Sequence, residues 1–391
     1  EIPLRLVGSE MCIRDSLYSA AHDHHGCHHV SRVWTRFARR SAPQGQEGSR
    51  VSGADAGAPG LRVTVSDVAA AAGVSRATAT RALKGEGRFA PETQERILAE
   101  AERLGYVRNT MAAELAAGRT GTVGLMLRDA SNPAYGLLFS RLQDEAHRRG
   151  LDLVTVTIGA DVQGAEQVNA LHRLLGMRVA GLIVATGGIT AAQLEPFADQ
   201  VPIVRAGRVE TAERIHTAHY DDPEHGRMLA SHVLSLGHRR VVVLSGAEDV
   251  SFAEHLRASA MESTLVAGGA SVTVVSAGAA PTDGVDEALD AVRDGATAAM
   301  CASDYRQLAV MRALRSAGLS VPGDVSVTGC DGILPGADLL GLTTLRIPVE
   351  AVAAAAVETM QLLLSSDADS APTVRQPFVG TLVPGSTAAA I

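Results

Sequence analysis

Three shortages in the sequence narrow the classes of protein to which it can belong. Aromatic residues make up only 3% of the chain, whereas hydrophobic residues as a whole make up 46%. Alanine, valine and leucine must therefore fill most of the core. The four cysteines contain no Cys-x-x-Cys pair, which argues against a disulfide framework and against a zinc site. No run of 18 apolar residues occurs and the N-terminus lacks a basic-then-apolar signal, so we expect a cytoplasmic protein without a transmembrane helix.

A surplus of positive charge is also absent. The 35 lysines and arginines are outnumbered by 43 aspartates and glutamates, which gives a formal net charge of −8. This balance excludes a protein that coats nucleic acid over its whole surface, but it allows a small DNA-binding module on an acidic body. Residues 62–120 are mildly basic, and the 391 residues give room for two or three domains.

The first 61 residues show no helix or strand periodicity, and we expect a non-native or disordered leader there. The run His22–His29 contains residue types that bind metals. Because such a tract in an unstructured leader is more often incidental, we expect no metal site. Residues 41–60 are rich in glycine, serine, alanine and proline, a composition that is typical of a linker.

Two short helices joined by a tight turn are predicted at the start of Ser66–Tyr106. Either Thr64 or Ser66 can cap the first helix, which Gly73 ends because glycine turns easily. Ser75 can cap a second helix that runs toward position 84. Small alanines allow the two helices to cross closely, which is the helix-turn-helix pattern, in which the second helix enters the major groove of DNA.

A third helix is predicted from Pro91 to Leu104, because proline suits the first helical position and Gly105 ends the helix. Its expected buried stripe consists of Ile97, Leu98, Ala101 and Leu104. A generic helical subdomain is the alternative interpretation. The polar residues at positions 75, 76, 80 and 81, which share one helix after the tight turn, favour DNA binding.

The stretch Asn109–Thr120 predicts a short helix that Asn109 can cap and Gly118 can end. An isolated helix of this length is marginal in water, so we expect it to fold only against DNA or a second copy of the chain. An ordinary flexible linker is the alternative. Leu115 favours coupled folding, because an apolar side chain on so short a helix needs a partner.

From Thr122 onward, apolar strands alternate with helices of ten or more residues, which predicts parallel sheets covered by helices on both faces. The alternation runs to about position 207 and resumes after Asp221, so we expect two successive α/β layers of similar size. Ligands of such sheets bind outside the carboxyl ends of the strands. A cleft between two such layers is a favoured place for a small molecule.

Eight short blocks between Val63 and Ala388 together resemble the LacI/GalR family of bacterial transcriptional regulators. The blocks, in order, are SDVAAAAGVSRATATRALKG, LGYVRNTMAAELAAGRTGTVGL, DASNPAYGLL, LGHRRVVVLSG, CASDYRQLAVMRALRSAG, VPGDVSVTGCDG, LTTLRIPVEAVAAAAVETMQLLL and LVPGSTA. The resemblance implies an all-α helix-turn-helix head, joined by a hinge helix to an α/β core. That core would be periplasmic-binding-protein-like (type I), with two Rossmann-like subdomains.

The implied domains are a head at 62–108, a hinge at 109–120 and an effector-binding and dimerisation core at 121–391. Within the core, the expected N-subdomain is about 121–220 and 331–365, and the C-subdomain about 221–330 and 372–388. The resemblance also implies a homodimer on near-palindromic operator DNA, most simply a repressor. A sugar or related metabolite in the cleft would change the affinity for DNA. No leucine-heptad tail follows Leu364, so we expect a dimer rather than a tetramer.

Positions that match the family's DNA contacts lie in the head and the hinge. They are Ser75, Arg76, Ala77, Thr80 and Arg81 on the second helix, and Asn109, Ala112 and Leu115 in the hinge. Arg81 can donate two hydrogen bonds to guanine, whereas Arg76 can read a base or only hold a phosphate. Leu115 matches the residue that wedges between base pairs in the minor groove and kinks the DNA.

Positions that match the family's effector site are spread over both halves of the core. They are Asp129, Asn132, Tyr135, Arg257, Asp304 and Asp331. An arginine and an aspartate facing one cavity suit the recognition of hydroxyl groups, because charge-assisted hydrogen bonds are strong and directional. The alternative for Arg257 is a surface ion pair.

Several positions depart from the family pattern. Arg108 replaces the usual proline before the hinge, and Ala90 replaces a serine-type cap that is worth about 0.5–2 kcal/mol. The usual Ser-Arg-Val reads Thr-Arg-Ala at positions 80–82, a tolerable change. Ala260 replaces a usual glycine, and Ala134 and Met261 stand where aromatic residues are expected, which argues against a simple hexose as effector.

Two other classes of protein remain to be weighed. A solute-binding protein of a transporter shares the core fold, but it needs a secretion signal and carries neither head nor hinge. An enzyme with a Rossmann-like core is disfavoured because no Gly-x-Gly-x-x-Gly follows a strand, no P-loop occurs and no nucleophile–base pair is evident. We therefore expect a nucleoid-associated regulator with no catalytic residues, no cofactor and no membrane partner.

Overall fold

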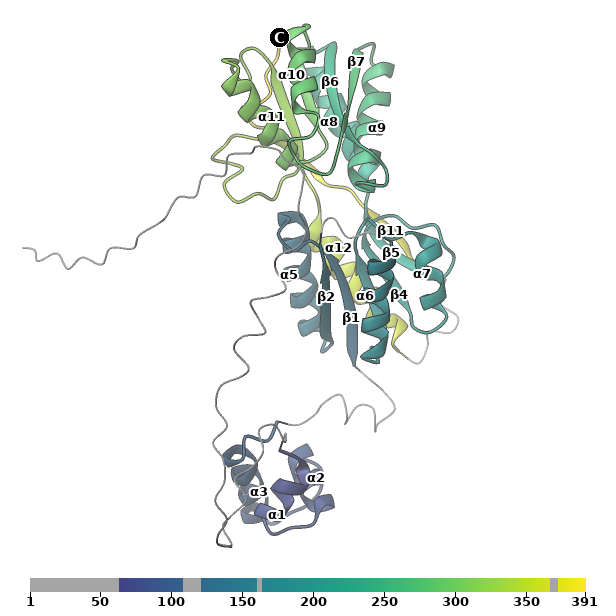
Figure 1. Cartoon of the computed structure of the whole chain (residues 1–391), viewed down its shortest axis with the longest axis vertical. Coiled ribbons are helices and arrows are strands. Elements are labelled where there is room, and N and C mark those ends of the chain that lie inside the picture. The colour runs from purple at the N-terminus through teal and green to yellow at the C-terminus, as the bar shows by residue number, and fades with distance from the viewer. Residues whose placement is uncertain (1–62, 108–120, 160–163, 366–371) are drawn as a thin grey trace, which may run out of the picture. The chain divides into compact units, whose positions relative to one another are not determined.

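The computed structural model describes residues 63–107, 121–159, 164–365 and 372–391 (Figure 1). The described chain divides into two compact units, with the boundary after Tyr106. The first unit is a three-helix head, and the second unit is a core that contains two sheets. No helix among the described residues has the length and apolar character that crossing a bilayer requires.

The head consists of α1 (Val65–Ala71), α2 (Arg76–Lys84) and α3 (Pro91–Arg103). Thr64 caps α1 in a capping box with Asp67, and Ser75 caps α2 by accepting a hydrogen bond from the next turn. The small residues that fill the core let the helices approach closely. The core is Val68, Ala69, Ala72, Ala79, Ala82, Ile97 and Ala101.

The predicted stripe of α3 was wrong at one position. Ile97 and Ala101 are buried and Leu104 is half-buried, but Leu98 is 46% exposed. Residues four apart lie on one side of a helix, so Ile97 and Ala101 face α1 and α2 together. Leu98 follows Ile97 by about 100° around the helix axis, which turns its side chain toward solvent.

The first sheet of the core is six-stranded and parallel, in the order β11-β5-β4-β3-β1-β2. Its strands are β1 (Thr122–Arg128), β2 (Asp152–Ile158), β3 (Gly181–Ala185), β4 (Ile203–Gly207), β5 (Ile215–Tyr220) and β11 (Arg375–Phe378). Helices α5 (Pro133–Arg148) and α12 (Val349–Leu363) cover one face. Helices α6 (Ala165–Gly176) and α7 (Ala191–Ala198) cover the other. Alternate residues of each strand supply the two cores, as in any sheet buried on both sides.

The second sheet repeats this plan in the order β12-β10-β9-β8-β6-β7, with only β12 antiparallel. Its strands are β6 (Arg240–Gly246), β7 (Ser271–Ala277), β8 (Ala298–Cys301), β9 (Ser326–Asp331), β10 (Thr343–Arg346) and β12 (Thr381–Val383). Helices α8 (Asp222–Ser235) and α9 (Phe252–Ala267) pack on one face. Helices α10 (Val285–Arg293) and α11 (Asp304–Ser316) pack on the other.

The chain passes between the two sheets at positions that differ from the expected subdomain boundaries. Residues 331–365 were expected to lie with the first sheet. Helix α12 does pack there, but β10 pairs with β9 in the second sheet, with Thr343 opposite Thr328. Residues 372–388 were expected to lie with the second sheet. Strand β12 does pair with β10 there, but β11 pairs with β5 in the first sheet. The crossings therefore follow β5, β10 and β11.

Candidate functional site

The exposed side of α2 carries the head residues that match DNA contacts in the family. They are Ser75 at the cap, then Arg76, Ala77, Thr80 and Arg81. The buried residues Ala79 and Ala82 lie on the opposite side of the helix. The Thr80 hydroxyl donates to the carbonyl of Arg76 (2.8 Å), and Nε of Arg81 donates to the carbonyl of Ala77 (3.4 Å). The helix thus presents two guanidinium groups to solvent on one side.

The hinge residues Asn109, Ala112 and Leu115 lie outside the described residues, as does Arg108. Their contacts with DNA stay predictions. The tract His22–His29 also lies outside the described residues. Among the residues that the structure describes, no group of side chains could hold a metal ion.

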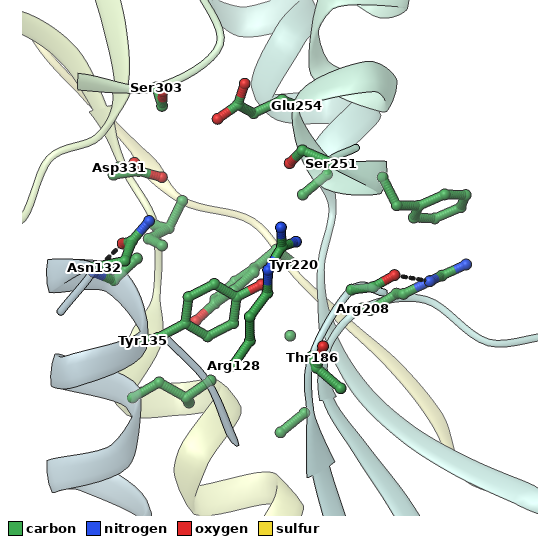
Figure 2. Close-up of a pocket in the computed structure, with 18 of the residues that line it drawn as sticks. Arg128, Asn132, Tyr135, Thr186, Arg208, Tyr220, Ser251, Glu254, Ser303 and Asp331 are labelled. Atoms are coloured by element: carbon green, nitrogen blue, oxygen red, sulfur yellow. Dashed lines mark hydrogen bonds between the residues drawn. The ribbon is translucent and has the colours of Figure 1, made fainter. Parts of the chain in front are cut away.

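A pocket lies between the two sheets of the core, at the carboxyl ends of their strands (Figure 2). It encloses about 740 Å³ of empty space, solvent at its open mouth included. The first sheet and its loops contribute polar and aromatic residues: Arg128, Asn132, Tyr135, Thr186, Arg208 and Tyr220. The second sheet and its helices contribute Ser251, Phe252, Glu254, Arg257, Ser303 and Asp331.

Four of the six residues that the sequence proposed for effector binding line this pocket: Asn132, Tyr135, Arg257 and Asp331. Asn132 caps α5 and accepts a hydrogen bond from the N–H of Ala134 (2.9 Å). Asp331 ends β9 with a positive φ of 120°. Asn132, Tyr135 and Asp331 lie along one side of the view in Figure 2.

The other two proposed residues lie outside the lining of this pocket. Asp129 shapes the turn after β1, where its carboxylate accepts hydrogen bonds from the N–H (3.1 Å) and hydroxyl (2.5 Å) of Ser131. Asp304 is buried at the start of α11 and accepts from the N–H of Gly332 (2.8 Å) and the hydroxyl of Thr344 (2.5 Å). Burial raises the pKa of Asp304 to about 6. Both carboxylates hold backbone in place, and their roles in effector binding stay predictions.

Arg257 is the centre of a buried ion-pair network rather than a surface ion pair. Its Nε donates to Asp222 (2.8 Å), and its Nη1 donates to Asp331 (3.0 Å) and to the carbonyl of Ala302 (3.0 Å). Burial raises the pKa of Asp222 to about 6 and that of Asp331 to about 7, although the guanidinium acts in the opposite direction. Through these bonds Arg257 connects α9 to the start of α8 and to the end of β9, on the side of the pocket that belongs to the second sheet.

His225 lies beside this network and is fully buried. Its Nε2 accepts a hydrogen bond from the N–H of Gly380 (2.8 Å), where the chain crosses from β11 to β12. Burial and the nearby charge of Arg257 lower the pKa of His225 to about 3. The imidazole is therefore neutral at physiological pH and serves as an acceptor for the crossing strand.

The sequence did not single out Arg128, Thr186, Arg208 or Tyr220, which all lie at or just after the end of a strand in the first sheet. Both Nη atoms of Arg128 donate to the carbonyl of Val250 in the second half of the core (3.3 and 3.4 Å). The rule that ligands bind at carboxyl strand ends would have found Arg128, Thr186 and Arg208 if it had been applied to each predicted strand in turn.

Aromatic side chains do line the pocket, although not at the positions where the family pattern places them. Met261 is buried in the core, and Ala134 leaves room at the pocket wall. Tyr135, Tyr220 and Phe252 supply the aromatic surface instead. The expected lack of an aromatic cleft residue is therefore no argument against a sugar.

The head and the core match separate family models. The model described as "Bacterial regulatory proteins, lacI family" matches residues 64–109. The model described as "Periplasmic binding protein-like domain" matches residues 230–388.

Curated relatives extend the match over most of the chain. The HTH-type transcriptional regulator MalR of Streptomyces coelicolor is 32% identical over 351 residues, which cover 84% of this chain and 98% of that protein. Catabolite control protein A of Priestia megaterium is 27% identical over 277 residues, 69% of this chain and 83% of that protein. The match to the maltose regulon regulatory protein MalI of Escherichia coli is 32% identical over 187 residues and spans 54% of that protein.

Solved structures show the same fold. The Lac repressor dimer bound to operator and the anti-inducer ONPF superimposes with a TM-score of 0.73 at 23% identity, covering 84% of this chain and 100% of the other. A complex of the transcriptional regulator CelR with cellobiose gives a TM-score of 0.60 at 25% identity, covering 83% and 100%.

A helix-turn-helix head followed by a two-sheet core with a pocket at the strand ends defines a ligand-responsive DNA-binding regulator. The chain belongs to the LacI family of bacterial regulatory proteins, and it is a DNA-binding transcriptional regulator. The relatives are regulators of this kind and not enzymes.

Proposed function

We propose that the protein is a repressor whose affinity for operator DNA is controlled by a small polyhydroxylated metabolite bound in the core pocket. The observation that carries this proposal is the composition of the pocket. Its walls come from both sheets, so a ligand there contacts both halves of the core at once. The cellobiose complex of CelR and the operator complex of the Lac repressor support a sugar and an operator as the two ligands.

Control follows from a shift in population between two arrangements of the halves of the core. Arg128 at the end of β1 donates to the carbonyl of Val250 in the turn between β6 and α9, so a hydrogen bond already joins the two halves of the core at the pocket. A ligand that binds one arrangement more tightly changes the affinity for DNA by the same factor by which DNA changes the affinity for ligand.

Two heads are needed for selective binding. One head presents only two arginines on its reading helix, and such a module alone binds weakly and with strong dependence on salt. We infer a homodimer in the cytoplasm, without catalytic activity, that places two heads on a two-fold symmetric site. A head fragment that ends near position 107 should lose most preference for that site.

Selection from a pool of random DNA duplexes with the full-length protein tests this function, because the selection itself identifies the operator sequence. We expect enrichment of one sequence with near two-fold symmetry, and retardation of that duplex by a dimer on a gel. A pool that stays random after repeated rounds would contradict the proposal and would favour a solute-binding protein with the same core.

A further inference from the structure

The carboxylates that line the pocket are already paired. Glu254 lies 2.7 Å from Arg306, whose guanidinium is almost completely buried. Asp331 lies 3.0 Å from Arg257, which also holds Asp222 at 2.8 Å. Both lining carboxylates belong to the second half of the core, and their charges are balanced by arginines on the same side.

The wall contributed by the first half of the core is different. Its described lining residues include two arginines, Arg128 and Arg208, and no carboxylate. The third arginine of this region, Arg205, lies fully buried behind the wall and is paired with Glu210 at 2.6 Å. The net charge of this wall is therefore positive. Figure 2 shows Arg128, Thr186 and Arg208 apart from Glu254 and Asp331, which lie toward the other half.

Arg208 is held in position with part of its guanidinium unused. Its Nη1 donates to the backbone carbonyls of Gly187 and Ile189, and its guanidinium carbon lies 4.0 Å from the centre of the Phe252 ring. Nε is buried without a hydrogen-bond partner, and Nη2 makes no hydrogen bond within the described part of the chain. Arg208 forms no ion pair with any described residue.

A partly buried guanidinium without an ion-pair partner attracts an anion, and Glu210 and Glu248 act on Arg208 only from beyond ion-pair distance. Burial lowers the pKa of Arg208, which reflects the unfavourable free energy of holding its charge there. Carboxylate and phosphate oxygens accept paired hydrogen bonds from guanidinium groups, and such bonds strengthen where water is excluded. The Thr186 hydroxyl, between the ends of the two arginine-bearing strands, adds a neutral donor at the same wall.

We propose that the effector carries an anionic group, a carboxylate or a phosphate, which binds at Arg208 and Arg128. The hydroxyls of the same molecule face Asn132 and Asp331. The ligand class is thus a sugar acid or a sugar phosphate rather than a neutral sugar. This inference rests on the proposed function, because it concerns the pocket through which that function is controlled.

Isothermal titration of the full-length protein with matched sugars tests the inference. Each set keeps one carbon skeleton: glucose, gluconate and glucose 6-phosphate; galactose, galactonate and galactose 6-phosphate; ribose, ribonate and ribose 5-phosphate. We expect at least one anionic member to bind tenfold or more tightly than its neutral counterpart, a difference of about 1.4 kcal/mol. The acid and phosphate members of each set distinguish the two anionic groups.

Two variants of Arg208 locate the preference. R208Q should weaken binding of the preferred anion at least tenfold and bring its affinity close to that of the neutral sugar. R208K, which keeps the charge without the planar fork, should retain part of the preference. The matched control is R293Q, because Arg293 is an exposed arginine on α10 whose one ion pair among the described residues is with Asp290. R293Q should leave every affinity unchanged.

Two results would overturn the inference: no set in which an anionic member binds more tightly than its neutral counterpart, or an anion affinity that R208Q leaves unchanged. Retardation of the selected DNA duplex is measured on the same wild-type preparation. Failure in the sugar titrations with intact DNA binding contradicts only the anionic effector, whereas loss of selective DNA binding contradicts the proposed function itself.

Discussion

Replacing Arg257 with methionine should destabilise the core by an amount that depends on pH. The R257M variant keeps a long side chain but leaves Asp222 and Asp331 buried without their partner. Removing one member of a buried ion pair typically lowers the free energy of unfolding by about 3–5 kcal/mol. We therefore expect a loss of that size for R257M at pH 7.5.

The loss should shrink as the pH falls, because the stranded carboxylates can take up protons. Burial already raises the pKa of Asp222 to about 6 and that of Asp331 to about 7, above the value of 3.8 for exposed groups. A carboxyl with a raised folded-state pKa contributes stability that is present at low pH and lost as pH rises through that pKa. Removal of the guanidinium raises both pKa values further, so the penalty of R257M continues to grow up to pH 7.5.

Each carboxyl that stays protonated in the folded state changes the free energy of unfolding by about 1.4 kcal/mol per pH unit. Comparing the variant with the wild type over two pH units, we expect the loss to be about 2 kcal/mol smaller at pH 5.5 than at pH 7.5. Urea unfolding followed by circular dichroism at the two pH values measures it. R293Q, which breaks an exposed pair, should lose under about 1 kcal/mol at both. A loss for R257M below about 1 kcal/mol, or one independent of pH, would refute this reasoning.

Three further predictions concern the head and the buried histidine. Ala90 caps α3 without a side-chain hydrogen bond, so A90S should raise the free energy of unfolding of the isolated head by about 1 kcal/mol in thermal melts; no change would mean that the cap is already satisfied. R81Q should lower the discrimination between the selected duplex and single-base variants by about 1–3 kcal/mol, and equal weakening on all duplexes would assign Arg81 to phosphate contact. The pKa of His225, lowered to about 3, makes the wild type lose stability as pH falls below about 6.5. Between pH 7 and pH 5, the free energy of unfolding of H225Q, measured by urea titration, should fall by about 2 kcal/mol less than that of the wild type. If the two free energies fell by the same amount, the neutral imidazole would be contradicted.

The regular alternation of helices and strands was readable in the sequence, but four strands were not. The strand β5 (Ile215–Tyr220) escapes the pattern because its histidines look polar, although every residue in it is buried. His216 is accommodated because its Nδ1 accepts a hydrogen bond from the N–H of Val374 (3.1 Å) beside β11. The short strands β10, β11 and β12 have three or four residues each, too few to show a period.

The pocket was predictable in location and only partly in its residues. The strand-end rule placed it correctly, and Asn132 and Asp331 follow from their positions at a helix start and a strand end. Whether a carboxylate there faces the cleft or the backbone depends on neighbours that are distant in sequence. Asp304 turns to Thr344, forty residues away, and for that reason its role could not be read locally.

The affinity of the full-length protein for its selected duplex, measured with and without a saturating pocket ligand from the sugar sets, tests the central claim most directly. Fluorescence anisotropy of the labelled duplex at fixed salt gives both values. Control through the pocket predicts a change of more than about tenfold, equivalent to about 1.4 kcal/mol of coupling between the two sites. Equal affinities with the ligand bound and absent would contradict it.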